Sequence, residues 1–273
     1  TLVNLVVWRS FDRGSNWQQI TKRGIKGNGI NVDPSTGRII LKSNLIVSNN
    51  NVICVLELRS LTTGGNNIAV LISRDGGTTF TDNVGLAVGL HHSVTAVALP
   101  NGTINYVYLD GTQSLKSLTV PYPGIRADGG WKTEHEKTIS TGTLTFCAQV
   151  GSGLTAYLQN GDITSWYHEG YLYVIAKDTN NKIIGFLSED DGETWQYIAS
   201  EFVSTVALGT VFQPNSTTIL EKFKATVWEG RSVVFIKTNL SIGLFYFGGF
   251  SSFSFPALVD QPDRFQYSNW DSN

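Results

Sequence analysis

Short apolar segments alternate with polar turns along the whole chain, and this pattern predicts strands rather than helices. β-branched and aromatic residues fill the segments, and no long stretch has apolar residues at helical spacing. Glycine, asparagine, aspartate or proline bounds each segment, as is typical of strands joined by turns. The predicted strands cover residues 3–8, 52–58, 68–72, 94–99, 104–109, 171–176, 183–187, 233–236 and 242–247. The chain is therefore expected to be all-β: a sandwich, a barrel or a propeller.

A hairpin of two apolar strands around a tight polar turn recurs at residues 45–55, 96–107, 165–174 and 226–235. Asn-Gly or Glu-Gly dipeptides in three of these turns supply the positive φ that tight hairpins need. A third strand, a turn and an aromatic residue follow each hairpin. Repetition on this scale favours a propeller, in which each repeat is one four-stranded sheet.

The turn after the third strand carries the most specific motif, Ser-x-Asp-x-Gly-x-(Thr/Asn)-(Trp/Phe). It occurs at residues 10–17, 73–80 and 188–195, which are called octets 1, 2 and 3 below. The Asp carboxylate can accept hydrogen bonds from turn amides, the glycine permits a positive φ, and the aromatic can pack beneath the turn. The residues assigned this structural role are Ser10, Asp12, Gly14, Trp17, Ser73, Asp75, Gly77, Phe80, Ser188, Asp190, Gly192 and Trp195.

These octets resemble the Asp boxes, or BNR repeats, of sialidase-like β-propellers, and the repeat pattern extends over the whole chain. In that family the box joins the third and fourth strands of a blade, on the rim away from the ligand. The resemblance therefore implies a β-propeller of four-stranded antiparallel blades. It also implies that Asp12, Asp75 and Asp190 are structural rather than catalytic, and that the protein is extracellular, at a cell surface or on a virion.

The repeats account for four blades and for one additional strand pair at the N-terminus. Residues 2–20 would supply only the third and fourth strands of a blade, so we expect the C-terminal segment, including residues 263–270, to complete it. A single five-bladed domain, residues 1–273, then results. The alternative is that the chain is part of a six-bladed or larger propeller.

Composition narrows the possible partners. The 20 Lys and Arg residues nearly balance the 22 Asp and Glu residues, whereas nucleic-acid-binding proteins usually have a basic excess. No apolar run reaches the roughly 18 residues of a membrane span. Cys54 and Cys147 lie in apolar surroundings and are expected to be buried free thiols. Neither a metal site nor a cofactor is predicted.

The sequence lacks the signature of a sialidase. Such an enzyme needs three arginines that bind a carboxylate, an Arg-Ile-Pro segment, a Tyr/Glu pair and an Asp acid. Arg-Ile-Pro is missing, and a triad is hard to assemble because only Arg59, with Arg23 or Arg38, is expected to reach the ligand face. Other glycosidases use two carboxylates across a cleft. The carboxylates expected on ligand-face loops are Glu57, Asp82, Asp110, Asp162, Asp178 and Glu201. If the chain is an enzyme, its catalytic candidates are Asp82, Asp110 and Asp178.

The main expectation from the sequence is therefore a non-catalytic propeller that binds a glycan or a glycoprotein. The ligand-binding candidates are Arg59, His91, His92, Asp110, Lys177, Asp178 and Lys237. Two alternatives stay open. One is a glycoside hydrolase, sialidase-like or of the carboxylate-pair type, with its site on the central channel. The other is a structural module that binds other subunits of an assembly.

Overall fold

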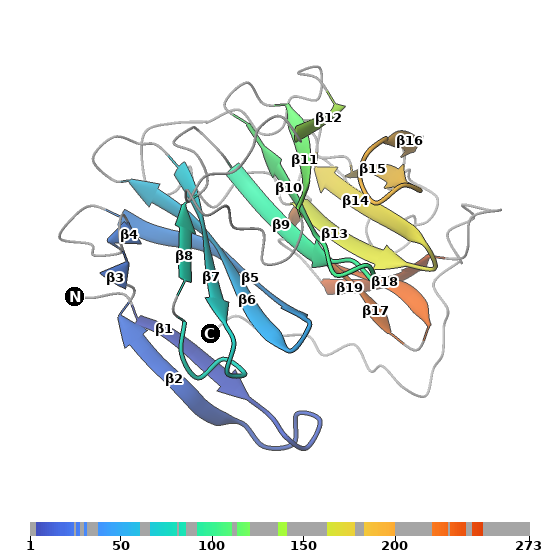
Figure 1. Cartoon of the computed structure of the whole chain (residues 1–273). Helices are drawn as coiled ribbons and strands as arrows, with labels where there is room; N and C mark the ends of the chain where they lie inside the picture. Colours follow the sequence, from blue (N-terminus) through green and yellow to red (C-terminus); the bar gives the residue numbers. More distant parts are fainter. Residues whose placement is uncertain are drawn as a thin grey trace. The chain divides into compact units, whose positions relative to one another are not determined.

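The regular elements of the described chain are all β-strands (Figure 1). The computed structural model describes residues 4–24, 26–27, 30–31, 38–60, 66–80, 82–85, 92–110, 114–120, 136–140, 163–177, 183–199, 220–228, 230–238 and 242–247. Each of the nine predicted strands is present in these ranges, with its ends shifted by at most about two residues. None of the described segments is a helix of the length and apolarity that a membrane span requires.

The described residues fall into two compact units, drawn from Thr1–Thr145 with Ser188–Trp195 and from Phe146–Leu187 with Gln196–Asn273. The first unit holds two four-stranded antiparallel sheets. One consists of β5 (Arg38–Ser48), β6 (Asn51–Ser60), β7 (Asn66–Ser73) and β8 (Asp82–Gly85), and the other of β9 (His92–Ala98), β10 (Ile104–Leu109), β11 (Leu115–Val120) and β12 (Glu136–Ser140). Two pairs complete it: β1 (Asn4–Arg9) with β2 (Gln18–Gly24), and β3 (Lys26–Gly27) with β4 (Ile30–Asn31).

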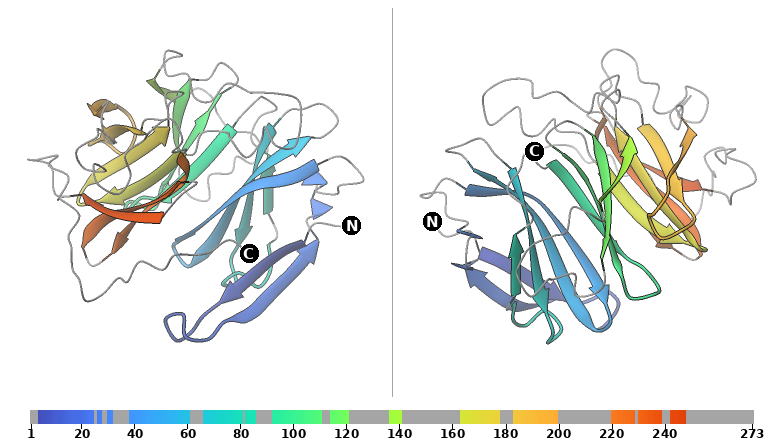
Figure 2. Two further views of the ribbon diagram at one scale, coloured as in Figure 1. Left: turned by 180° about the vertical axis from the view of Figure 1, so that it is seen from behind. Right: turned by 45° about the horizontal axis from the view of Figure 1, so that its top comes forward.

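The second unit holds two further antiparallel sheets (Figure 2). The first consists of β13 (Ile163–His168), β14 (Tyr171–Lys177), β15 (Ile183–Ser188) and β16 (Gln196–Ala199), and the second of β17 (Leu220–Trp228), β18 (Arg231–Thr238) and β19 (Ile242–Phe247). In every sheet the strands pair in chain order, as expected when short turns connect successive antiparallel strands. Meanders of this kind are what the repeated hairpins of the sequence predict.

Sheet β5–β8 is covered on both faces because its central strands are apolar at nearly every position. Ile53 and Val55 point to one face, where they pack with Tyr106 of β10. Cys54 and Leu56 point to the other face, where they pack with Val7 of β1. Successive strand residues alternate between faces, so one apolar run serves two cores. Full burial of each such aliphatic side chain contributes roughly 1.5–3 kcal/mol.

Cys54 is a free thiol in this core and is 2% exposed, as predicted for one of the two cysteines. Burial raises the pKa of the Cys54 thiol to about 12, because the apolar surroundings disfavour the thiolate. Cys54 therefore acts as a small apolar side chain. Cys147 lies outside the described residues.

Polar contacts join the two sheets of the second unit. Trp166 Nε1 donates to Ser232 Oγ at 2.8 Å, and Ser232 Oγ lies 2.9 Å from His168 Nδ1. The Ala225 amide donates to Thr164 Oγ1 at 3.1 Å. Since Trp166, Thr164 and Ser232 are all buried, these contacts satisfy polar groups that would otherwise be costly to remove from water.

The three octets fold alike. In each, the serine hydroxyl donates to the first Asp oxygen at 2.7–2.8 Å and accepts the glycine amide at 2.7–2.8 Å. The same Asp oxygen accepts the amide of the seventh residue at 2.7–2.8 Å, and the other Asp oxygen accepts that residue's side chain at 2.5–2.6 Å. Gly14, Gly77 and Gly192 have φ of +95°, +92° and +96°, a conformation that glycine adopts without steric cost.

These hydrogen bonds hold the pKa of each octet carboxyl group below its usual value. The Thr79 hydroxyl, the Thr79 amide and Ser73 lower the pKa of Asp75 to about 2. The amide and side chain of Asn16 lower the pKa of Asp12. Burial by itself would raise the pKa of Asp190, but its hydrogen bonds from Thr194 and Ser188 together lower it. The carboxylate form of all three is therefore favoured in the folded protein.

Octets 2 and 3 also dock on the sheet that precedes them in the chain. A Cβ atom on Gly77 would lie 3.2 Å from Ile20 Cδ1 and 3.4 Å from Val7 Cγ1. Gly192 lies against Asn105 of β10 and Thr119 of β11, and a Cβ atom on it would lie 2.6 Å from Asn105 Nδ2. The glycine thus lets each turn approach the preceding sheet more closely than any other residue would.

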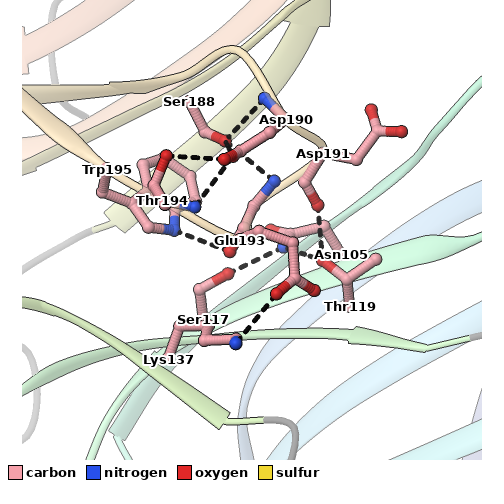
Figure 3. A network of polar contacts seen from close by, with 11 residues as sticks. Asn105, Ser117, Thr119, Lys137, Ser188, Asp190, Asp191, Glu193, Thr194 and Trp195 are labelled. Atoms are coloured by element: carbon pink, nitrogen blue, oxygen red, sulfur yellow. Dashed lines mark hydrogen bonds and ion pairs between the residues drawn. The ribbon is translucent and has the colours of Figure 1, made fainter.

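Polar contacts surround the docked Gly192 in octet 3. The Thr119 hydroxyl donates to the Asp191 carbonyl at 2.7 Å, and Asn101 Nδ2 donates to Asp191 Oδ2 at 2.8 Å. Lys137 Nζ lies 2.8 Å from Glu193 Oε2 (Figure 3). Octet 3 therefore belongs to the first unit by its contacts, although it connects two strands of the second.

Octet 1 provides a matched control for the packing role of glycine. Gly14→Ala and Gly192→Ala introduce the same methyl group at nearly the same positive φ, which should cost about 1–2 kcal/mol at each position. Only the alanine at 192 also collides with a docked sheet, since Gly14 has no neighbour other than Trp17 within 4 Å of its added Cβ. We expect Gly192→Ala to lower the free energy of unfolding by roughly 1–3 kcal/mol more than Gly14→Ala, as measured by urea denaturation. Equal losses would show that docking does not constrain Gly192.

The octet carboxylates should make stability depend on pH at the acidic end. Because the folded pKa of Asp75 is about 2 and its usual value is 3.8, its stabilising effect is present above about pH 4 and is lost as the pH falls through about 2. We expect the difference in Tm between the wild type and Asp75→Asn to narrow over that interval in thermal scans. The control is Glu189→Gln in octet 3, because Glu189 is exposed. If the Tm difference between this variant and the wild type narrowed over the same pH interval, the pH dependence could not be assigned to Asp75.

Candidate functional site

Each four-stranded sheet has two distinct ends. The hairpin between its first and second strands lies at one end, together with octets 2 and 3 in the sheets that contain them. We call the opposite end, where the second strand stops and the third begins, the loop end. Octets 2 and 3 lie at the other end of their sheets. Loops carried on a rigid sheet are common places for binding and catalysis.

Five of the ligand-binding candidates lie at the loop end of their own sheets. They are Arg59 near the end of β6, His92 at the start of β9, Asp110 directly after β10, Lys177 at the end of β14 and Lys237 near the end of β18. The positions of His91, Asp162, Asp178 and Glu201 fall outside the described residues. Their common position at the loop end follows from the strand pattern, because the positions of the hairpins determine which strand ends come together.

Two expected loop carboxylates lie elsewhere. Asp82 begins β8 opposite Ile72, only two residues after octet 2, so its predicted position on a ligand-face loop is wrong. The fourth strand begins directly after the octet and leaves no loop there. Glu57 lies inside β6 rather than on a loop and is 3% exposed. Of the three proposed catalytic aspartates, Asp110 is the one that the described structure places at a loop end.

Lys116 lies at the centre of a polar cluster at the loop end of β10–β12. Its Nζ atom is 3.3 Å from Glu136 Oε1, 3.7 Å from Asp110 Oδ2 and 2.9 Å from Thr138 Oγ1, to which it donates. The side chains of Lys116, Asp110 and Glu136 are each only 18–19% exposed. One ammonium group therefore compensates two half-buried carboxylates, which would otherwise repel each other in a medium of reduced dielectric.

Tyr108 ties the second carboxylate to the core of the sheet. Its hydroxyl donates to Glu136 Oε2, and its ring packs in the apolar cluster between the two sheets of the first unit. Burial first, then the hydrogen bond to Glu136 and the charges of Glu136 and Asp110, raise the pKa of the Tyr108 hydroxyl. The phenol therefore stays protonated and acts as a donor that orients Glu136.

Asp110 is held by the short connection between β10 and β11. Its Oδ1 accepts the Ser114 amide at 2.9 Å, and its own amide donates to the Ser114 carbonyl at 3.0 Å. The Tyr108–Lys116 and Leu109–Leu115 pairs of the ladder end directly beside this connection. Asp110 is thus positioned by local hydrogen bonds on a short side chain, which lowers the entropic cost of presenting it.

A β-bulge extends this polar region towards β6. Ser93 and Val94 of β9 together oppose Tyr108, and Ser93 has a positive φ of +53°. The buried Glu57 carboxylate accepts the Ser93 amide at 2.9 Å and so stabilises a conformation that is uncommon for a non-glycine residue. Bulges are common next to active sites, and this one directly follows His92 in β9.

The polar cluster contains residues that sequence reasoning missed. Tyr108, Lys116 and Glu136 were not among the candidates, because Tyr108 lies 28 residues from Glu136 and nothing local links them. Tyr108 and Lys116 could have been found from the hairpin register around the 110–114 connection. In the part of the chain that the structure describes, no group of three His, Cys, Asp or Glu side chains could hold a metal ion.

Removing the central cation tests the cluster. Lys116→Met keeps most of the side-chain volume but leaves the Asp110 and Glu136 carboxylates without their shared cation. We expect a loss of about 1–3 kcal/mol in the free energy of unfolding at pH 7, because the two half-buried carboxylates lose a charge-assisted partner. Lys137→Met is the control, because its pair with Glu193 is 41% and 59% exposed and should contribute at most about 1 kcal/mol. Similar losses in the two variants would refute the central role of Lys116.

No protein-family model matches the chain, and no curated protein matches it in sequence. Solved structures do share its fold. Bacteroides ovatus Xyloglucan PUL GH43B has a TM-score of 0.57 at 8% identity, over 90% of this chain and 48% of that one. The xylan β-1,4-xylosidase from Bacillus halodurans C-125 has a TM-score of 0.55 at 11% identity, over 90% and 48%. The intramolecular trans-sialidase from Ruminococcus gnavus has a TM-score of 0.51 at 12% identity, over 85% and 45%.

These similarities show the fold of the chain, a β-propeller of the kind found in GH43 and trans-sialidase glycoside hydrolases. The chain spans about half the length of these structures. They contradict the main functional expectation from the sequence, a non-catalytic glycan-binding propeller, and favour the glycoside hydrolase alternative. The missing sialidase signature bears on one chemistry only, whereas the structures that share this fold include an enzyme named as a xylosidase.

Proposed function

We propose that the chain forms the propeller of a glycoside hydrolase, with carboxyl groups at the loop end as its catalytic groups. The main support is the half-buried Asp110 carboxylate, which Lys116 and Ser114 hold at the loop end in a fold shared with glycoside hydrolases. Most glycoside hydrolases use two carboxyl groups, one that protonates the leaving oxygen and one that acts as base or nucleophile. The substrate on this proposal is a glycan.

Asp110 fits the role of base or nucleophile. The Lys116 ammonium at 3.7 Å and the Ser114 amide at 2.9 Å both stabilise a carboxylate over a carboxylic acid. Glu136 is a positioning residue, because it binds the same ammonium and accepts the Tyr108 hydroxyl. Asp178, the other catalytic candidate from the sequence, lies outside the described residues and stays a prediction.

The finer description of the fold is also a proposal. The octets are assigned as Asp boxes because all three share one set of hydrogen bonds around a positive-φ glycine. Five blades are supported by the four larger sheets together with the pair β1–β2, which flanks octet 1 as β7–β8 flanks octet 2. On this description the loop ends form the ligand side of the propeller.

Hydrolysis of aryl glycosides of xylose, galactose, arabinofuranose and sialic acid tests the function. We expect the wild type to cleave at least one of them and Asp110→Asn to lower kcat by about 100-fold or more, with Tm within a few degrees of the wild type. Glu193→Gln, at the octet end, is the control and should keep full activity. A folded wild-type protein that cleaves none of the four, or an Asp110→Asn variant with unchanged kcat, would refute the proposal.

A further inference from the structure

Glu57 is a buried carboxylate that the proposed catalytic groups do not include. It lies in β6 near the end of the strand at Ser60 and is 3% exposed. Ile53, Val55 and Glu57 occupy alternate positions of β6 and therefore face the same side of its sheet. Ile53 and Val55 pack in an apolar cluster with Tyr106 of β10. Glu57 thus takes the place of the next apolar residue in this row, at the loop end of the core.

A carboxylate in this position requires hydrogen bonds, because removing it from water is costly. Glu57 Oε2 accepts the Ser93 amide of β9 at 2.9 Å. This bond joins the two four-stranded sheets of the first unit across their shared core. Because the donor is a backbone group, the bond constrains the path of β9 directly.

The bulge in β9 sets the register at the start of this strand. Its two residues, Ser93 and Val94, lie opposite one residue of β10, so that His92 pairs with Leu109. Without the extra residue, the ladder would place His92 opposite Asp110. A shift of one residue also moves a strand's side chains to the opposite face of the sheet. The bulge therefore decides how the start of β9 is presented beside Asp110.

The conformation of the bulge needs support from groups outside β9. Ser93 has a φ of +53°, in a region that residues other than glycine seldom occupy. Such a conformation persists where the surrounding structure holds it in place. The Glu57 carboxylate supplies one such contact from the facing sheet.

We propose that Glu57 is a positioning residue of the hydrolase site: by holding the Ser93 bulge, it fixes where β9 begins beside Asp110. This role rests on the proposed function, in which Asp110 acts as base or nucleophile. Glu57 is not itself a catalytic residue, because it is buried and its Oε2 binds a backbone amide. The role requires an acceptor atom at this position and does not require a negative charge.

Three variants test this role with the aryl glycoside that the wild type cleaves. Glu57→Leu removes the acceptor, and misplacement of the chain beside Asp110 should lower kcat/KM by about 10–100-fold. Glu57→Gln should recover most of that loss, because it retains an acceptor oxygen. Adding Ser93→Gly to Glu57→Leu should also recover activity, because glycine adopts a positive φ without support. A 100-fold loss in Glu57→Gln, as for a catalytic acid, would overturn the proposal even if Glu57→Leu fails to fold.

Asn44→Leu is the matched control for a loss of stability alone. Asn44 is buried in β5, and its Nδ2 donates to the Ala96 carbonyl at 3.0 Å. This bond joins the same two sheets where the β9–β10 ladder is regular. We expect Asn44→Leu to lower Tm and to leave kcat/KM unchanged. An equal loss of kcat/KM in Asn44→Leu and Glu57→Leu would contradict a positioning role.

Backbone amide signals in NMR spectra separate this role from the hydrolase function. In Glu57→Leu the signals of His92 and Asp110 should shift, and the Ser93 amide should exchange at least about 10-fold faster, because it has lost its acceptor. Unchanged signals would overturn the proposal even if the wild type is an active hydrolase. Shifted signals in a protein that cleaves no glycoside would refute the hydrolase function and support the hold of Glu57 on the bulge.

Discussion

The glycine at the fifth position of each octet is the constraint on which the packing of the first unit depends. Its positive φ brings the serine and aspartate into a closed set of hydrogen bonds. Its missing side chain then allows the turn to approach the preceding sheet, at Val7 and Ile20 for octet 2 and at Asn105 and Thr119 for octet 3. One residue thus sets both the local turn and the distance between neighbouring sheets, since a Cβ atom would obstruct the second contact.

Octets 2 and 3 occupy one end of their sheets, whereas the opposite, loop end carries a cluster of polar side chains. At the loop end of β10–β12, polar groups are held by contacts between strands rather than by a tight turn: Lys116 between Asp110 and Glu136, and Tyr108 on Glu136. The bulge at Ser93, held by the buried Glu57, is the one place where the regular ladder of this sheet is interrupted inside the β9–β10 pair. This polar region therefore has side chains held in fixed positions and a break in the strand ladder beside them. Both features are common in binding and catalytic sites.

The functional expectation from the sequence failed for an instructive reason. The octets indicated a fold, and the missing Arg-Ile-Pro segment counted against one activity of that fold, but a fold hosts several chemistries. The structural neighbours include enzymes named for xylan and for sialic acid on similar scaffolds. The absence of one catalytic signature was therefore weak evidence against catalysis in general.

The sequence by itself determined the strands, the tight hairpin turns and the hydrogen bonds of the octets, because each of these depends on residues close together in the chain. It also placed Arg59, His92 and Asp110 at strand ends, since hairpin spacing determines which ends meet. Only the tertiary structure decided that the buried Glu57 accepts the Ser93 amide, and that Tyr108 and Lys116 meet Glu136. Those contacts join strands up to 36 residues apart, and they depend on register and sheet packing, which local pattern does not specify.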